Sequence, residues 1–274
     1  MGNCCCVGDT SLTKSAVAIK FPDGVAGIEY SDDLNQFIHC KDINEWLQSL
    51  YLHSDATKWV LYNDETDDIV EKGHHTKGHC KGIVTWGDTS ISWLCHSVPN
   101  FPREFTGKTI SLISPIGGKE LVYGQSFQYI ELPYHNDTLI AIMKQLSIMQ
   151  ANIYVSNHDL TFQASREHEM STIVLTPTIT HIAKSPYHPI NIYSQHIAKK
   201  YPSIWHEGLD VDVDTVKDTV ISQDHSKWAI SETDLYWVGD LDRTTSHFRR
   251  GGGGFLIRHA GISIALRAVL QKRA

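Results

Sequence analysis

The sequence predicts an α/β protein made of two similar halves that share one active site. Runs rich in β-branched and aromatic residues alternate with stretches of helical periodicity, which is typical of sheets flanked by helices. The chain has 274 residues, enough for one large domain or two fused halves. A motif of His-x-Lys, strand, turn and second strand occurs once in each half. We expect a flexible, cysteine-containing N-terminus at 1–15 and halves at 16–150 and 151–274.

The first half contains strong local signals for both kinds of element. Asp42 is positioned to cap a helix that carries Trp46 and Leu50 on one face, and Asp137 opens a second helix. The stretch KGIVTWGDTSISWLCHSV, residues 81–98, predicts a hairpin because two β-rich runs flank Gly-Asp-Thr. Further strands are expected at 16–22, 58–64, 108–114 and 126–132.

The second half repeats this mixture. Residues 172–183 are rich in strand formers, 191–201 are helix-like, and 225–243 again have the pattern of a hairpin. The glycines at 251–254 are interpreted as the loop before the last helix. They lack the Lys-Ser/Thr ending of a phosphate-binding loop, which argues against phosphate binding there. The last segment predicts a helix with Ile262 and Leu266 on its core-facing side.

Composition places the chain among ordinary globular proteins, with 41% hydrophobic and 20% charged residues. It contains no apolar run long enough to span a membrane and no visible signal peptide. Three of the six cysteines are adjacent, at Cys4, Cys5 and Cys6, which does not suit a disulfide framework. The opening MGNCCC resembles a lipidation signal, so membrane attachment through the N-terminus is one interpretation. A plain flexible terminus and a metal-binding cysteine tract are the others.

The net charge of −7 argues against a standing affinity for polyanions at neutral pH. Protonation of all 16 histidines would make the net charge positive. The protein could therefore bind nucleic acid in acid only. The alternative is that surface histidines are simply abundant.

His-x-Lys occurs four times, at His39/Lys41, His75/Lys77, His79/Lys81 and His225/Lys227. A His and a Lys two apart on a strand point to the same face. Only the pairs at His79 and His225 are followed by a strand, a turn and a second strand, which carry Trp93 and Trp237 respectively. This repeat predicts that these two pairs meet across one cleft. The pair at His75 is then either a bystander or a flank that contacts the substrate.

Two facing His-Lys pairs can cleave a phosphodiester. One neutral imidazole attacks phosphorus while the other, protonated, gives its proton to the leaving oxygen. The two lysines hold the non-bridging oxygens and offset the charge that grows in the transition state. This chemistry needs no metal or other cofactor. It is fastest where both protonation states coexist, on the acidic side of neutrality.

The stretch GHCKGIVTWGDTSISWLCHSVPNFP resembles the deoxyribonuclease II family, whose signature is a His-x-Lys-Gly strand followed at this spacing by HSVPNFP. DHSKW at 224–228, WVGDLDR and RRGGGG resemble the second His-x-Lys of that family and its closing motif. LYND at 61–64, YGQ at 123–125 and IAKSPYHPINIYS at 182–194 match further family segments in the same order, so the resemblance covers nearly the whole chain.

The resemblance implies a metal-independent acid endonuclease that hydrolyses DNA and leaves 3′-phosphate ends. It also implies a phospholipase D-like pseudo-dimer of two mixed-sheet halves flanked by helices. By that analogy His79 is the nucleophile, His225 the general acid, and Lys81 and Lys227 bind the scissile phosphate. His96, Asn100, Asp240 and Arg243 are candidates for orienting the histidines or the DNA. The oligomeric state is not predicted.

The family is usually secreted or lysosomal, whereas this chain shows neither a leader nor C-terminal cysteines. A membrane-anchored position on a cytoplasmic face is the alternative location. The alternative functions are a phospholipase D-like enzyme acting on a lipid or another phosphodiester, and an inactive DNA-binding relative. A zinc site made of His75, His79 and Cys80 is a further alternative, although a strand separates positions i and i+4 by about 13 Å.

Overall fold

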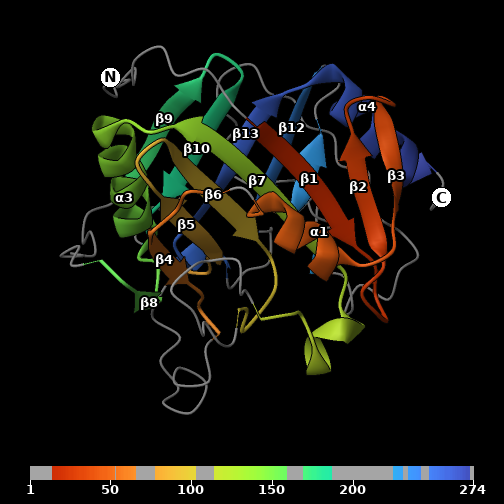
Figure 1. The fold of residues 1–274 in the computed structure, drawn as a ribbon, viewed down its shortest axis with the longest axis horizontal. Helices are drawn as coiled ribbons and strands as arrows, with labels where there is room; N and C mark the ends of the chain where they lie inside the picture. The colour runs from red at the N-terminus through yellow and green to blue at the C-terminus, as the bar shows by residue number, and fades with distance from the viewer. Residues whose placement is uncertain are drawn as a thin grey trace.

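The part of the chain that the structure describes forms two antiparallel sheets and three α-helices (Figure 1). The structure, a computed structural model, describes residues 14–52, 54–65, 78–102, 114–158, 169–186, 225–230, 234–241 and 247–271. The predicted strand at 108–113, the predicted helix at 191–201, and the residues Cys4–Cys6, His75, Lys77 and Arg243 lie outside these ranges.

The first sheet has eight strands in the order β3-β2-β1-β7-β6-β5-β4-β8. Their bounds are β1 (Lys14–Lys20), β2 (Gly27–Ser31), β3 (Gln36–Cys40), β4 (Lys58–Tyr62), β5 (Gly82–Trp86), β6 (Ser90–His96), β7 (Gln125–Pro133) and β8 (Ile153–Ser156). The predicted strands at 16–22, 58–64 and 126–132 and the predicted hairpin of β5 and β6 are confirmed. The hairpin of β2 and β3 and the short strand β8 were not predicted.

The second sheet has five strands in the order β11-β12-β13-β10-β9. Their bounds are β9 (Met170–Thr176), β10 (Ile179–Lys184), β11 (Trp228–Ile230), β12 (Leu235–Gly239) and β13 (Gly252–Arg258). The predicted strands at 172–183 form the hairpin of β9 and β10, and β11 and β12 form the second expected hairpin. The α/β class is therefore confirmed in its coarse form.

The helices are α1 (Ile43–Leu50), α3 (Asn136–Met149) and α4 (Ala260–Gln271), with two short 3-10 turns, η2 (Gly118–Val122) and η4 (His247–Arg249). The Asp42 side chain caps α1, since its carboxylate accepts a hydrogen bond from the Asn44 N–H at 2.7 Å. No helix in the described part of the chain is both long and apolar enough to cross a membrane.

The main core lies between the two sheets. Trp93 on β6, Leu146 on α3 and Phe255 on β13 belong to this one buried cluster. Helix α3 follows β7 of the first sheet in the chain but packs against β9, β10 and β13 of the second sheet (Figure 1). Helix α4 contacts β3 of the first sheet and β12 of the second. A second cluster fills the opposite face of the first sheet, where Trp46 of α1 packs edge-on against Phe127. The first sheet therefore buries apolar side chains on both of its faces, which stabilises it within the fold.

Two predictions about the sheets need correction. Every strand pair in the described residues is antiparallel, whereas mixed sheets were expected; short hairpin connections such as Gly87–Thr89 favour antiparallel pairing, and parallel pairs need long crossovers. The glycines expected as a loop instead enter a buried strand, because β13 begins at Gly252. A Cβ added at Gly253 would lie 2.8 Å from the Cε1 of His181, so a glycine is required for close packing.

Five neighbouring strands of each sheet correspond in space, although along the chain β1 precedes β2 whereas its counterpart β10 follows β9. Strands β2-β1-β7-β6-β5 of the first sheet correspond to β9-β10-β13-β12-β11 of the second. The registers align as well: the His96 N–H donates to the Lys81 carbonyl at 3.1 Å, and the Gly239 N–H donates to the Lys227 carbonyl at 3.0 Å. His96 and Gly239 therefore occupy equivalent positions after the two His-x-Lys stretches.

The two tryptophans that suggested the repeat are not equivalent. Trp93 pairs with Val84, three residues after Lys81, whereas Trp237 pairs with Ala229, two residues after Lys227. A shift of one residue turns a side chain to the other face of a strand. Trp93 accordingly lies in the core between the sheets, and Trp237 lies in a separate small cluster. The hairpins after the two His-x-Lys stretches correspond in space, but Trp237 was the wrong residue to align with Trp93.

Candidate active site

The two candidate catalytic stretches lie at the same end of the paired sheets, each just before a strand. The stretch from His79 to Lys81 precedes β5, and the stretch from His225 to Lys227 precedes β11. Asp240 follows β12 and is bonded to the first stretch, while the neighbouring Gly239 is bonded to the second. The structure therefore connects the two His-x-Lys stretches to one turn at the end of β12.

Two contacts hold His79 in place. Its backbone N–H donates to the Gly251 carbonyl at 2.7 Å, and its ring Nδ1 lies 2.8 Å from the Asp240 carbonyl oxygen. A carbonyl only accepts, so Nδ1 carries the hydrogen, and Nε2 of the neutral ring is the unprotonated nitrogen that can accept a hydrogen bond or act as a nucleophile. Burial, followed by the charge of Lys81, holds the pKa of His79 well below its usual value. A buried neutral imidazole of this kind is suited to act as a nucleophile.

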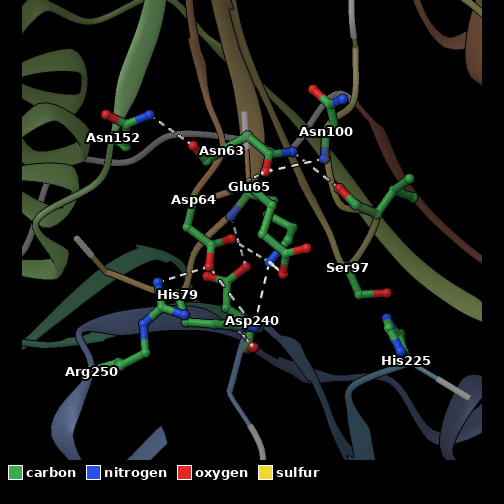
Figure 2. A network of polar contacts seen from close by, with 12 residues as sticks. Asn63, Asp64, Glu65, His79, Ser97, Asn100, Asn152, His225, Asp240 and Arg250 are labelled. Carbon is green, nitrogen blue, oxygen red and sulfur yellow. Dashed lines mark hydrogen bonds and ion pairs between the residues drawn. The ribbon is translucent and has the colours of Figure 1, made fainter. Parts of the chain in front are cut away.

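A buried ion-pair network surrounds Nε2 of His79 (Figure 2). The Lys81 ammonium contacts the Asp64 carboxylate, and the Arg250 guanidinium lies 2.8 Å from the other carboxylate oxygen. The Lys81 Nζ is 3.5 Å from Nε2 of His79, and Asp64 Oδ2 is 4.0 Å from it. Burial raises the pKa of Asp64, but the charges of Lys81, His79 and Arg250 outweigh it and hold the pKa below the ordinary value. Asp64 therefore stays ionised between two cations.

Asp240 joins the two halves of the site. One carboxylate oxygen accepts the Lys81 N–H at 3.2 Å and lies 3.5 Å from the thiol of Cys95, while the other accepts the Gly253 N–H at 3.3 Å. Burial raises the pKa of Asp240 to about 7, although the charge of Lys81 and the backbone hydrogen bonds oppose this shift. Its carbonyl also orients His79, so Asp240 is in contact with the nucleophile candidate and the phosphate-binding candidate together.

His225 has a different environment. Its ring stacks on Tyr123, with centroids 4.2 Å apart and an interplanar angle of 18°, and its backbone N–H donates to the Gly124 carbonyl at 2.9 Å. The Lys227 N–H donates to the Ser126 hydroxyl at 2.9 Å. Figure 2 shows His225 nearest to Ser97 among the labelled residues, at the opposite side of the view from Arg250. An aromatic face and a serine hydroxyl thus contribute to the contacts of this stretch.

Two further predicted site residues, His96 and Asn100, lie at the end of β6 and in the loop after it. The His96 side chain is fully buried against Phe101 and Phe127, where burial, followed by the charge of Lys81, lowers its pKa to about 3. The Asn100 N–H donates to the Asn63 side-chain oxygen at 3.3 Å. The Val98 N–H also donates to His96 Nδ1 at 3.2 Å, so both residues contribute to holding the loop after β6.

Four residues at the site were not predicted: Asp64, Glu65, His247 and Arg250. The ring of His247 is 4.1 Å from that of His79, and Glu65 is 3.8 Å from the Lys81 ammonium at the more exposed side of the network. Asp64 ends the segment LYND, and Arg250 precedes the glycines of RRGGGG. Both segments carry the family resemblance, and that was the one available signal for these residues.

Asp64, Glu65 and His79 each offer one ligand atom, and these atoms lie within 4.8 Å of one another. The space around Asp64 already holds the ammonium of Lys81 and the guanidinium of Arg250. A divalent cation would have to displace these charges, so the donor set suits an ion-pair network better than a metal. Of the three residues in the zinc alternative, His79 belongs to this group, Cys80 does not, and His75 lies outside the described residues.

Comparison with known proteins gives the class. The family model described as Deoxyribonuclease II matches residues 30–204 and 210–273. The chain therefore belongs to the deoxyribonuclease II family. Family membership places it among the nucleases that hydrolyse DNA.

Individual relatives agree with this assignment. The chain is 28% identical over 254 residues to deoxyribonuclease-2-beta of Mus musculus, covering 76% of this chain and 69% of the relative. It is 26% identical to cell-death-related nuclease 7 of Caenorhabditis elegans, covering 74% and 65% respectively. It is 24% identical to deoxyribonuclease-2-alpha of Bos taurus over 296 residues, covering 90% and 78%.

Proposed function

We propose that the protein is an acid endonuclease that hydrolyses DNA phosphodiesters without a metal and leaves 3′-phosphate ends. The observation that carries the proposal is the pair of His-x-Lys stretches bonded to the single Gly239–Asp240 turn. Phosphodiester cleavage by two histidines needs both to reach one phosphate, and this connection brings the two stretches to one place.

In the first step, Nε2 of His79 attacks phosphorus and the bond from phosphorus to O5′ breaks. The protonated ring of His225 gives its proton to O5′, so the leaving strand departs as an alcohol. In the second step the neutral His225 removes a proton from water, the water oxygen bonds to phosphorus, and the bond to His79 breaks. This step releases a 3′-phosphate and regenerates both histidines.

Cations placed around His79 support the phosphate. Lys81 lies 3.5 Å from Nε2, close enough to contact a non-bridging oxygen during attack. Arg250 reaches the same network through Asp64 and offers further N–H donors. Lys227 is proposed to do the same beside His225. Asp64 fixes the positions of Lys81 and Arg250 before DNA arrives, which reduces the cost of ordering them.

The lowered pKa of His79 favours acid operation. A ring with a low pKa stays neutral, and therefore nucleophilic, at a pH where an ordinary histidine is protonated. His225 must be protonated to act as the acid, and acidic solution favours that form. Activity is therefore expected to rise as the pH falls below neutrality and to decline only when His79 itself is protonated.

The proposal extends to a phospholipase D-like pseudo-dimer. Its support is the shared strand order and the matched registers of the two sheets. We also propose action in an acidic, lysosomal or secreted compartment, which cell fractionation would test. A lipid-modified N-terminus is a separate proposal, which mass spectrometry of the native N-terminus would test.

Plasmid cleavage with EDTA across pH 4 to 8 tests the function. Wild-type protein is expected to nick and linearise the plasmid below neutral pH, with ends that need phosphatase treatment before extension by a polymerase. His79→Ala and His225→Ala are each expected to lose at least about 100-fold of the rate. Supercoils that stay intact after long incubation with folded wild-type protein would exclude the nuclease.

The same preparations test the two alternatives. Release of the headgroup from phospholipid vesicles, with the plasmid intact, would favour a lipid phosphodiesterase. A gel shift with DNA that persists in both histidine variants, together with no cleavage by wild type, would favour an inactive DNA-binding relative. Retention of both His-x-Lys pairs at one edge favours the nuclease over the second alternative.

A further inference from the structure

Two buried lysines lie at the ends of equivalent strands. Lys20 ends β1 and is 1% exposed, and Lys184 ends β10 and is fully buried. In the matched registers Lys20 pairs with Gln125, the first residue of β7, and Lys184 pairs with Gly252, the first residue of β13. The two lysines therefore occupy the same position in the two halves. Neither belongs to a His-x-Lys pair.

Each lysine donates a hydrogen bond to the backbone carbonyl of the residue two positions before its pairing partner. The Lys20 ammonium donates to the carbonyls of Tyr123 at 2.7 Å, Phe21 at 2.8 Å and Leu121 at 3.0 Å. The Lys184 ammonium donates to the Arg250 carbonyl at 2.8 Å and to the Ser185 carbonyl at 3.3 Å. An ammonium has three donors and no acceptor, so it suits a turn that presents several carbonyls.

The carbonyl of the next residue in each turn accepts a hydrogen bond from a candidate catalytic histidine of the other half. The Gly124 carbonyl accepts the His225 N–H at 2.9 Å, and the Gly251 carbonyl accepts the His79 N–H at 2.7 Å. The residues that the lysines hold also flank the sites through their side chains. Tyr123 stacks on the ring of His225, and Arg250 joins the network around His79.

These contacts form two crossed chains. One runs from Lys20 through Tyr123 and Gly124 to His225, and the other runs from Lys184 through Arg250 and Gly251 to His79. Each chain starts in one sheet and ends at the histidine stretch that precedes a strand of the other sheet. The contact between the halves is thus made at the two backbone positions that place the reactive rings.

We infer that Lys20 and Lys184 are positioning residues, with Lys20 fixing His225 and Lys184 fixing His79 across the interface between the halves. Their catalytic relevance rests on the proposed nuclease function, whereas the placement of each ring can be measured without DNA. Loss of one ammonium frees the turn that it holds and shifts one histidine ring. A displacement on the order of 1 Å is enough to lower the rate of an enzyme about 100-fold.

The test replaces each lysine by methionine, which keeps the length of the side chain and removes its donors. Histidine ring resonances are recorded by 15N NMR on the full chain without DNA at pH 5, and assigned with His79→Ala and His225→Ala. Lys184→Met is expected to shift the His79 resonances and leave those of His225 in place. Lys20→Met is expected to do the reverse. The exposed Lys58, replaced by methionine, is the matched control and is expected to shift neither.

Plasmid cleavage by the same variants gives a second readout. Each buried-lysine variant is expected to lose at least about 10-fold in kcat with KM within about twofold, because the ring that reacts is displaced while DNA contacts remain. Lys20→Gln and Lys184→Gln, which keep a shorter donor, repeat the test if a methionine variant does not fold. Rings that shift together in both variants, or in neither, would overturn the inference. Wild-type protein that leaves DNA intact would refute the nuclease function and leave the NMR result to decide the positioning.

Discussion

The two histidine sites have the same backbone frame and different side chains. In each, the histidine N–H donates to a glycine carbonyl just before a strand of the other sheet, at Gly251 for His79 and at Gly124 for His225. The residue before that glycine is Arg250 in the first case and Tyr123 in the second. The first histidine therefore lies beside an ion-pair network and the second beside an aromatic ring.

Ser97 and Asp240 also occupy equivalent backbone positions and carry different side chains. The Ser97 N–H donates to the Ser126 carbonyl at 3.1 Å, and the Asp240 N–H donates to the Gly253 carbonyl at 3.0 Å. The hydroxyl of Ser97 accepts the Ser126 N–H at 3.0 Å, as the Asp240 carboxylate accepts that of Gly253. A hydroxyl in one half thus replaces a carboxylate in the other. Duplicated backbone geometry with unequal charges can supply two histidines of different protonation, which a two-step hydrolysis requires.

The largest effect is expected from Asp64→Asn. The change removes the buried carboxylate that Lys81 and Arg250 share, so we expect a loss of about 3–5 kcal/mol in the free energy of unfolding and at least about 100-fold in cleavage rate. Because the folded pKa of Asp64 is depressed, its contribution to stability is present above the ordinary carboxyl pKa and is lost as the pH falls through the folded value. Urea denaturation at several pH values measures it.

Asp88→Asn, in the exposed turn of the β5–β6 hairpin, is the control for Asp64 and should change neither quantity. An Asp64→Asn protein as stable as wild type would contradict the assignment of a buried ion-pair network.

Arg250→Met and Tyr123→Leu compare the equivalent neighbours of the two histidines. Loss of the guanidinium is expected to lower kcat/KM for DNA about 100-fold, because it removes donors close to the attacking ring. Loss of the tyrosine ring is expected to cost only about 10-fold, since stacking orients His225 without contributing charge. Steady-state cleavage assays give both values. Equal losses would mean that charge does not distinguish the two sites.

Asp240→Asn and Ser97→Ala compare the carboxylate with the hydroxyl. Because the pKa of Asp240 is raised to about 7, the folded protein holds a proton that the unfolded chain releases near pH 4. The stability from this group is therefore complete below about pH 4 and is lost as the pH rises through about 7. Asp240→Asn should remove this pH dependence, which amounts to up to a few kcal/mol in the free energy of unfolding, as measured by thermal unfolding from pH 4 to 8. Ser97→Ala should leave the slope unchanged.

The smallest effect is expected from His75→Ala. Its His-x-Lys lacks the following hairpin, so plasmid cleavage should stay within about twofold of wild type. A loss as large as that of His79→Ala would show that the wrong His-x-Lys had been aligned with the pair at His225.

Local signals in the sequence determined several elements correctly. Asp42 caps α1, residues 82–96 form a hairpin, and Ile262 and Leu266 lie buried on α4. These features depend on neighbours within a few residues, where capping and periodicity are readable. The repeated His-x-Lys with its hairpin also directed attention to His79 and His225, and both stretches lie at the same edge.

Only the tertiary structure decided which distant side chains surround each histidine. Asp64, Arg250, Lys20 and Lys184 come from four separate segments, and ion pairs or ammonium–carbonyl contacts between such segments leave no periodic pattern in the sequence. The glycine-rich strand β13 was missed for the same reason, because close packing against another strand, rather than local propensity, selects those glycines. The sequence by itself determined the reactive residue types and their repeat. Packing of one sheet against the other determined the charge around each ring, since charge and burial at a site depend on contacts between distant segments.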